Sequence, residues 1–415
     1  MSLKVENMKK SLVLLTSLLA LCSLTGCNQE VRHKLNEITS YVFEVPTYTE
    51  LDEKYADDYF KQTYYNWGGG CSAIAKTILD PGEGSETSRK RTIVGRNMDL
   101  NISNKCAYIV RTEVPGKNKT FGLAYTFREI SEDYNIVKEK GISDQLYKVL
   151  PFLCDDVMND KGLYVEINMR NGEYWPSGED KFACSGTNPY YKDKTVYMFE
   201  LPRYIAENCS RVSEVEEYVK GLNIYSKEYY WNYAFIIADR SGDYGLLELA
   251  NNRIYWIPGQ DCQTNFYINE NCNAAEELPC GIGRYNYLKK HIDGVNTKQE
   301  MFDLMKDVSY SQIYNARTCK FDCRSEMIGS LPWLDYSFLM AMDEYKEAAI
   351  EMMYEATADV RAMTREEKAN LNQYWESSFT EVADTKEMTI QVRFFENESK
   401  VYEISFTKIR KLLTE

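Results

Sequence analysis

A cysteine follows a run of three glycines in the segment Gly68-Gly69-Gly70-Cys71. The 415-residue chain contains only two histidines, so the usual basic partner of a nucleophilic thiol is scarce. A cysteine that becomes the first residue of a cleaved chain carries its own base, because a free α-amine has a pKa of about 7.7–8.0. Cleavage between Gly70 and Cys71 would therefore create a base and a nucleophile on one residue. The alternative is a buried structural cysteine, and the flexible glycine run argues against it.

Arg96 and Asp99 form a second polar pair, at the end of a predicted strand. An aspartate near a new α-amine would hold it by a charge-assisted hydrogen bond. An arginine near the sulfur would favour the thiolate. Residues three apart on a strand point to opposite faces unless a turn begins there. Taken alone, such a pair is more often a surface salt bridge.

Six short segments follow one another along the chain in an order that is typical of a known superfamily. They are Cys71-Ser72-Ala73-Ile74-Ala75, Gly95-Arg96-Asn97-Met98-Asp99, Met158-Asn159-Asp160-Lys161-Gly162-Leu163, Asn168-Met169-Arg170, Thr264-Asn265-Phe266 and Gly283-Arg284-Tyr285. Together they resemble the choloylglycine hydrolase superfamily of N-terminal-nucleophile (Ntn) cysteine amidases, which includes bile salt hydrolases, penicillin V acylases and the acid ceramidase branch. The resemblance covers roughly residues 71–335 and 385–410. The opening after the glycines is nearer to the acid ceramidase branch than to bile salt hydrolases.

The resemblance implies that Cys71 supplies the nucleophilic sulfur and that its freed α-amine is the general base. It implies that Arg96 and Asp99 orient the thiol and the amine, which agrees with the charge argument. Arg284 is expected to lie against Cys71 and Asp99. Without the ordered series of motifs, Arg284 would be read as a surface charge.

Asn265 is expected to donate its side-chain amide to the oxyanion of a tetrahedral intermediate, joined by Asn168 or a backbone N–H. Losing one such donor typically lowers turnover by about 10²–10³. The expected reaction is hydrolysis of a linear, non-peptide amide C–N bond in a small N-acyl compound, through an acyl-enzyme. It requires no metal and no organic cofactor.

The composition is compatible with a large folded core and excludes some partners. Hydrophobic residues make up 44% of the chain, and the net charge is −14. Nucleic-acid phosphates demand a basic surface, so a nucleic-acid partner is not expected. The sequence leaves the oligomeric state open, including a homo-oligomer.

The N-terminus has the pattern of a bacterial export signal. Lys9 and Lys10 precede an apolar run over residues 12–24, which ends in Leu24-Thr25-Gly26-Cys27. The run is too short to span a bilayer, and small residues before a cysteine resemble a lipoprotein signal in which Cys27 is lipidated. An ordinary signal peptide with a chance cysteine is the alternative. We therefore expect an exported protein of the bacterial cell envelope, attached to the membrane only through its N-terminal lipid.

The chain divides into three predicted regions: a signal peptide at residues 1–27, a tether and pro-segment at 28–70, and an Ntn-hydrolase domain at 71–415 with a helical insertion at 339–376. Nine cysteines remain beside Cys71 and the two of the signal. Disulfides persist in an exported chain, but the sequence cannot assign the pairs. The pair Cys319 and Cys323 lacks accompanying metal ligands, which favours a local disulfide or two buried thiols.

Short apolar runs between turn signals predict strands, and capping boxes predict helices. Strands are expected at residues 71–78, 92–99, 107–112, 121–127, 162–170, 233–238, 245–250, 254–257, 389–395 and 400–406. Helices are expected to begin at Ser213 and Thr297, each followed three residues later by a glutamate. Strands, then helices, then strands again predict an α+β fold with mostly antiparallel sheets. The resemblance specifies a four-layer αββα sandwich.

Three other functions remain open at this stage. The same fold could pass the acyl group to an amine and act as an acyltransferase. A non-catalytic surface lipoprotein could bind a ligand through tyrosine-rich loops, with Cys71 internal and unreactive. In a papain-like enzyme His291 would have to reach Cys71, since His33 lies in the pro-segment.

Overall fold

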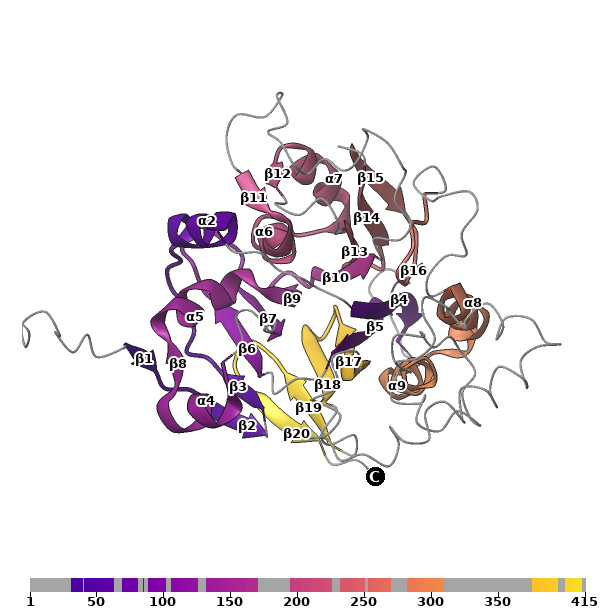
Figure 1. Cartoon of the computed structure of the whole chain (residues 1–415). Helices are drawn as coiled ribbons and strands as arrows, with labels where there is room; N and C mark the ends of the chain where they lie inside the picture. Colours follow the sequence, from indigo (N-terminus) through magenta and orange to yellow (C-terminus); the bar gives the residue numbers. More distant parts are fainter. Residues whose placement is uncertain are drawn as a thin grey trace, which may run out of the picture.

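Two large sheets packed face to face form the centre of the molecule (Figure 1). The computed structural model of the chain describes residues 31–39, 41–62, 69–80, 85, 89–101, 106–125, 132–170, 195–225, 232–250, 253–269, 282–309, 375–394 and 400–412. The cysteine of the glycine run lies in this described part. The predicted signal peptide and Cys27 lie outside it.

The first sheet has nine strands. In spatial order they are β15 (Arg253–Pro258), β14 (Tyr244–Ala250), β13 (Asn232–Ala238), β10 (Tyr164–Arg170), β9 (Cys154–Asn159), β7 (Thr120–Tyr125), β6 (Ala107–Thr112), β3 (Val42–Glu44) and β2 (Asn36–Thr39). All neighbours are antiparallel except β3 and β6, which are parallel. The predicted hairpin between β13 and β14 is confirmed, and Gly242 supplies its positive φ of 98°.

The second sheet has seven strands and contains the cysteine. In spatial order they are β16 (Cys262–Gln263), β4 (Gly69–Leu79), β5 (Lys90–Asn101), β17 (Trp375–Asp384), β18 (Thr389–Phe394), β19 (Val401–Ile404) and β20 (Ile409–Leu412). All of its neighbours are antiparallel. The central strands β4, β5 and β17 are therefore buried between partners on both sides.

Helices cover the outer faces of both sheets. Helices α6 (Leu201–Asn208) and α7 (Val212–Lys220) lie on the side of the first sheet, while α8 (Ile282–His291) and α9 (Lys298–Asp307) lie against β4, β5 and β17 (Figure 1). Strand β4 contacts β10 and β13 of the opposite sheet. The predicted α+β class and the four-layer αββα sandwich are confirmed.

The smaller elements lie at the edges of the sandwich. They are α2 (Glu53–Gln62), α4 (Tyr134–Lys140), α5 (Asp144–Val149), the 3₁₀ turns η1 (Leu150–Phe152), η3 (Met198–Glu200) and η5 (Ile292–Gly294), and the strand pairs β1 (Arg32–His33) with β8 (Ile142–Ser143) and β11 (Thr195–Tyr197) with β12 (Asn223–Tyr225). Among the described residues, no helix has the length and apolar character needed to span a membrane.

The described part of the range 28–70 is folded into the domain. Strand β3 pairs with β6, and Val42, Phe43 and Phe60 are buried in the core. The ring of Phe60 stacks on Tyr197 with a centroid distance of 4.9 Å. This segment therefore contributes packing to the first sheet. Its removal as a pro-segment stays a prediction.

Of the two predicted capping boxes, one is confirmed and one is wrong. Thr297 caps α9 by accepting a hydrogen bond from the Glu300 nitrogen at 3.2 Å. Helix α7 instead begins at Val212, so Ser213 lies inside its first turn. The nitrogen of Val212 donates to the Asp239 carboxylate at 2.8 Å, so a distant turn supplies the cap.

The predicted helical insertion at 339–376 lies outside the described residues, apart from its last two positions. Trp375 and Glu376 begin strand β17, which corrects the prediction there. Their backbone pairs with the end of β5, and such tertiary pairing overrides helix propensity. The structure describes five cysteines, all buried; of these, Cys154, Cys209 and Cys262 are free thiols, and the others are Cys71 and Cys106. The pair Cys319 and Cys323 lies outside the described residues.

Candidate active site

Cys71 lies at the third position of β4, next to β5. Its register partner is Met98, and the Met98 sulfur lies 4.0 Å from the Cys71 sulfur. Cys71 is 1% exposed and belongs to the core between the sheets. The strand begins at Gly69, so the Gly70–Cys71 bond is part of the extended β4 backbone.

The backbone nitrogen of Cys71 is bound by the side chain of Asn265, just beyond the end of the neighbouring strand β16. Strand β16 pairs Gln263 with Ala73 and then stops. Asn265, two residues further on, accepts a hydrogen bond from the Cys71 nitrogen through Oδ1 at 3.1 Å. Arg284 donates to the same oxygen from Nη2 at 2.7 Å. Asn265 is therefore held at the nitrogen that cleavage would convert into an amine.

Arg284 joins this nitrogen site to Asp99. Its Nη1 donates to the Cys71 carbonyl at 2.9 Å and lies 3.4 Å from Asp99 Oδ2. Both charged side chains are fully buried. The structure thus brings together four of the six expected site residues, Cys71, Asp99, Asn265 and Arg284.

A buried glutamate fixes the loop that carries Asn265. Glu248 of β14 accepts hydrogen bonds from the nitrogens of Ile268 and Asn269 at 2.8 and 3.1 Å. The loop is thereby tied to the first sheet although β16 belongs to the second. Asn265 is positioned by both sheets.

Arg96 points away from Asp99, as the three-residue spacing predicts. The neighbouring Asn97 donates to the Met305 carbonyl of α9 at 2.7 Å, so this face of β5 is covered by helix. Arg96 extends from the other face into the space between the sheets. Its Nη2 lies 3.7 Å from the Met98 sulfur. Met98 therefore contacts both the guanidinium and the Cys71 sulfur.

The guanidinium of Arg96 is held by two carboxylates of the opposite sheet. Nη1 pairs with Asp156 of β9, and Nε lies 3.1 Å from Glu166 of β10. Its Nη2 also donates to the Ile167 carbonyl at 2.6 Å. Burial alone would lower the pKa of Arg96, but Asp156 and Glu166 raise it well above its ordinary value. Arg96 stays charged and links the two sheets.

Burial raises the pKa values of the acids around Arg96, whereas burial alone lowers that of Arg96 itself. It raises the pKa of Glu166 to about 8, against the attraction of Arg96. It also raises the pKa of Asp156, and Arg96 again limits the shift. Removing a carboxylate from water disfavours its charged form, and a nearby cation offsets only part of that cost. Some of the carboxyl groups around Arg96 are therefore protonated near neutral pH.

Asn168 lies beside these acids. Its Nδ2 donates to Glu166 Oε1 at 3.2 Å, and its buried Oδ1 has no hydrogen-bond partner among the described residues. Asn168 is thus connected to Arg96 through Glu166, whereas Asn265 is connected directly to Cys71. The expected cooperation of the two asparagines at one oxyanion stays a prediction.

Both histidines have other surroundings. His33 Nε2 lies 3.0 Å from Asp144, and its ring stacks on Tyr147. His291 is exposed at the end of α8, where its ring packs against Tyr287. A papain-like pairing of either imidazole with the buried thiol is not supported by this arrangement.

Sequence reasoning missed the residues that support the site. These are Met98, Asp156, Glu166, Glu248 and Glu381. A signal was present for some of them, since a glutamate in an otherwise apolar strand, such as Glu166 between Val165 and Ile167, indicates a paired buried charge. The partner of such a charge comes from another strand, which sequence alone does not identify.

Comparisons with known proteins found a matching family model and distant similarity to solved structures. The family model described as acyl-coenzyme A:6-aminopenicillanic acid acyl-transferase matches residues 87–328, a segment that begins after Cys71. A variant of the conjugated bile acid hydrolase from Clostridium perfringens is 12% identical, with a TM-score of 0.40, covering 83% of this chain and 97% of its own. For penicillin V acylase from Agrobacterium tumefaciens the identity is 11%, the TM-score 0.37, and the coverage 82% of this chain and 91% of its own.

No curated protein matches the sequence. The family match nevertheless spans more than half of the 415 residues and includes Arg96, Asp99, Asn168, Asn265 and Arg284. It also confirms the superfamily that the motifs predict, whose members act on acyl amides. This chain therefore belongs to the acyl-coenzyme A:6-aminopenicillanic acid acyl-transferase family of Ntn-hydrolases.

Proposed function

We propose that this protein is a self-processed cysteine amidase that hydrolyses the linear C–N bond of a small N-acyl amide. The observation that supports it most directly is the environment of the Cys71 nitrogen, held by Asn265 and close to Arg284 and Asp99. If the nitrogen becomes an ionisable amine, these polar groups can bind and orient it through charge-assisted hydrogen bonds.

The proposed processing step breaks the peptide bond between Gly70 and Cys71. The Cys71 sulfur attacks the Gly70 carbonyl, the C–N bond breaks, and the nitrogen takes up a proton to become the α-amine. Water then hydrolyses the thioester and releases the Gly70 carboxylate. The new amine has a pKa of about 7.7–8.0, which suits a general base near neutral pH.

Catalysis then repeats the same bond changes on the substrate. The Cys71 sulfur attacks the acyl carbonyl, the amine product leaves with a proton, and water releases the acid. Arg284, which donates to the Cys71 carbonyl and lies 3.4 Å from Asp99, would help to orient Cys71, and Arg96 would supply positive charge on the other side of Met98. Asn265 would donate from its amide nitrogen to the oxyanion.

We propose that the segment before Cys71 stays bound after cleavage. Strand β3 and helix α2 belong to this segment, and their buried side chains, including Phe43 and Phe60, pack in the common core. Exposing these side chains would cost roughly 1.5–3 kcal/mol for each large one. The mature enzyme would then consist of two chains.

Acyl transfer is the second candidate function, because the family model is named for an acyltransferase. The acyl-enzyme would be the same, and an amine would replace water as the acceptor. The proposed amidohydrolase and this acyltransferase differ only in whether water or an amine accepts the acyl group.

We also propose export and a lipid anchor on Cys27, on the strength of the N-terminal pattern. Metabolic labelling with a fatty acid in a bacterial host tests it. Label should appear on the wild type and be absent from Cys27→Ala.

The activity is tested with a panel of N-acyl amides that differ in acyl length and leaving amine. Wild-type protein and a Cys209→Ala control, which removes another buried thiol, should release the amine. Cys71→Ala should release none. An added amine separates the two candidates, since an acyltransferase forms a new amide and a hydrolase forms free acid. A Cys71→Ala protein that retains turnover would refute the proposal.

A further inference from the structure

Four carboxyl groups and one guanidinium share the dry space behind Cys71. The guanidinium is that of Arg96, and the acids are Asp155, Asp156, Glu166 and Glu381, none more than 2% exposed. An ionised carboxylate without a partner in such a place costs several kcal/mol. One guanidinium cannot keep four buried neighbours ionised, so some of them carry a proton. Among the described residues, no group of three or more acids, cysteines and histidines could hold a metal ion.

Glu381 differs from the other acids in what it contacts. It lies directly opposite Arg96 in the ladder between β5 and β17. Within the described residues, however, the ion pairs of Arg96 are with Asp156 and Glu166. Glu381 Oε1 instead accepts a hydrogen bond from the Tyr164 hydroxyl, which also lies 3.2 Å from Asp156 Oδ1 and so bridges the two carboxyl groups. It therefore acts on Arg96 through another acid.

A single hydroxyl cannot satisfy this pair of carboxyl groups. Tyr164 has one hydrogen, yet its oxygen lies 3.2 Å from Asp156 Oδ1 and also contacts Glu381 Oε1. The second oxygen, Glu381 Oε2, is buried and has no hydrogen-bond donor among the residues that the structure describes. Ionising two buried carboxyl groups that share one hydroxyl is strongly disfavoured by their mutual repulsion, so the pair holds a proton. Because Arg96 pairs with Asp156, that proton belongs on Glu381.

We propose that Glu381 is a neutral positioning residue: its protonated carboxyl group donates a hydrogen bond to Asp156 and thereby fixes the Arg96 guanidinium against Met98 and the nucleophile. The effect on catalysis rests on the proposed role of Cys71, whereas the protonation of Glu381 does not.

The proton on Glu381 also lowers the negative charge near the Cys71 sulfur. Burial, followed by the charge of Asp156, raises the pKa of Glu381 well above its ordinary value. The groups around the pair are Arg96 of β5, Asp155 of β9, and Tyr164 and Glu166 of β10. A second ionised acid here would disfavour the Cys71 thiolate. Protonated Glu381 provides the hydrogen bond without that charge.

Two substitutions of similar volume test the catalytic part. Glu381→Gln keeps a neutral donor for Asp156 and an acceptor for Tyr164, so kcat, KM and the pH profile of kcat/KM should stay within about threefold of wild type. Glu381→Met has neither group and should lower kcat about tenfold, with KM little changed, because it leaves buried polar atoms unpaired. If Glu381→Gln is as impaired as Glu381→Met, or shifts the pH profile, Glu381 is an ionised counter-charge and the proposal is wrong.

Infrared spectroscopy tests the protonation without activity. In a Cys71→Ala background, the difference between Glu381 protein and Glu381→Gln at pH 7 should show the carbonyl stretch of a protonated carboxyl group. Glu207→Gln is the control, since Glu207 pairs with Arg203 at 2.7 Å and no acid band should be lost. If Glu381→Gln does not fold, Glu381→Met gives the same comparison. Loss of a carboxylate band at Glu381 would overturn the proposal even if Cys71 proves catalytic.

Discussion

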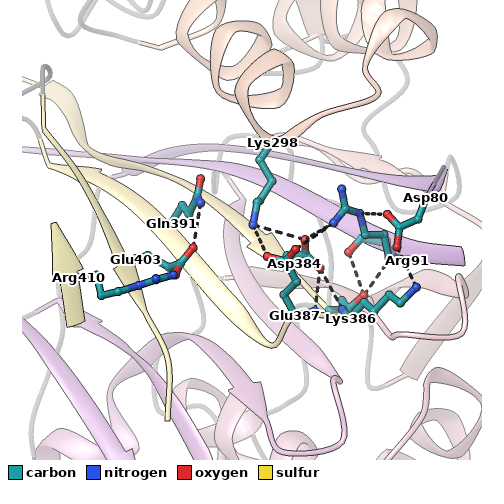
Figure 2. Close-up of polar contacts among 11 residues, drawn as sticks. Asp80, Arg91, Lys298, Asp384, Lys386, Glu387, Gln391, Glu403 and Arg410 are labelled. Carbon is teal, nitrogen blue, oxygen red and sulfur yellow. Dashed lines mark hydrogen bonds and ion pairs between the residues drawn. The ribbon is translucent and has the colours of Figure 1, made fainter. Parts of the chain in front are cut away.

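Strands β5 and β17 carry two sets of charges that differ in their access to water. Near one end lies what we call the rim network, which consists of Asp80, Arg91, Lys298, Asp384, Lys386 and Glu387 (Figure 2). Three register positions from Asp384 along the same ladder lies Glu381, opposite Arg96. One ladder thus serves a half-exposed network and a dry cluster.

The rim network is redundant. Asp384 lies 3.1 Å from Arg91 and 3.7 Å from Lys298, and its Oδ1 accepts from the nitrogens of Lys386 and Glu387 at 3.1 and 3.0 Å (Figure 2). Loss of one cation leaves others in place. In the Arg96 cluster a single guanidinium faces several acids. This difference in the number of cations indicates that the rim charges connect β5, β17 and α9 in a way that tolerates the loss of one partner. The charges behind Cys71 depend on the position of Arg96.

The largest expected difference comes from removing one arginine in each region. Arg96→Met should cost about 3–5 kcal/mol in the free energy of unfolding, because it leaves buried Asp156 and Glu166 without their cation. Arg91→Met should cost about 1 kcal/mol or less. Urea unfolding in a Cys71→Ala background, where no cleavage intervenes, provides the comparison. Equal losses would show that the two regions do not differ as described.

A substitution at the nitrogen site should affect turnover more than stability. Asn265→Ala should lower kcat/KM by about 10²–10³, because it removes the amide that accepts from the Cys71 nitrogen and that we propose as the oxyanion donor. Asn269→Ala is the matched control in the same loop and should stay within about threefold. Steady-state kinetics on one N-acyl amide measures both. An unimpaired Asn265→Ala enzyme would exclude Asn265 from the site.

One acid of each region, Glu166 in the Arg96 cluster and Asp80 at the rim, should respond to pH with opposite signs. The raised pKa of Glu166, about 8, means that the folded state holds its proton more tightly than the unfolded state. Its contribution therefore falls as pH rises from about 4.5 to 8, by at most about 1.4 kcal/mol per pH unit, and Glu166→Gln should flatten that decline. Unfolding curves across this range measure it, and an unchanged slope in Glu166→Gln would contradict the assignment.

For Asp80, at the rim, the sign is the reverse. A hydrogen bond from Lys386 lowers the pKa of Asp80, despite partial burial. The stability from Asp80 is present above its unfolded pKa and is lost as pH falls through the lower folded value. Asp80→Asn should therefore flatten the acid side of the curve only, below about pH 4. A change on the alkaline side instead would contradict this reading.

The smallest effect is expected from Lys386→Ala. The ion pair with Asp80, 2.8 Å long, is partly exposed and should contribute less than about 1 kcal/mol. The loss should shrink further at high salt, because mobile ions screen exposed charges. The Arg96→Met loss should change little with salt, since that cluster excludes water. If the stability loss of Lys386→Ala did not depend on salt, the ion pair of Lys386 would be more shielded from solvent than its exposed fraction indicates, which would contradict this prediction.

The sequence was most informative where local patterns suffice. Strand β6 begins and ends at the predicted residues, and the hairpin at Gly242 and the cap at Thr297 follow from turn and capping preferences. Ordered motifs also located Cys71 and its neighbours in the fold. Each of these signals lies within a few residues, so no distant partner is needed to recognise it.

What could not be predicted depends on distant partners. Strand β17 completes the central sheet and supplies Glu381, yet its start was predicted as helix because its pairing residues lie in β5. The cap of α7 comes from Asp239, more than twenty residues away. The acids around Arg96 come from three strands of two sheets. Their role follows from burial and proximity, which the sequence does not contain.

The central claim is that the chain breaks between Gly70 and Cys71, and mass spectrometry tests it most directly. Under denaturing conditions purified wild-type protein should give two masses, with Cys71 as the first residue of the larger chain. Under native conditions the two should travel as one complex, because β2 and β3 belong to the first sheet and the side chains of Phe43 and Phe60 are buried in the core. Cys71→Ala should give one unbroken chain. A wild-type polypeptide that is continuous through Gly70 and still turns over substrate would contradict the account.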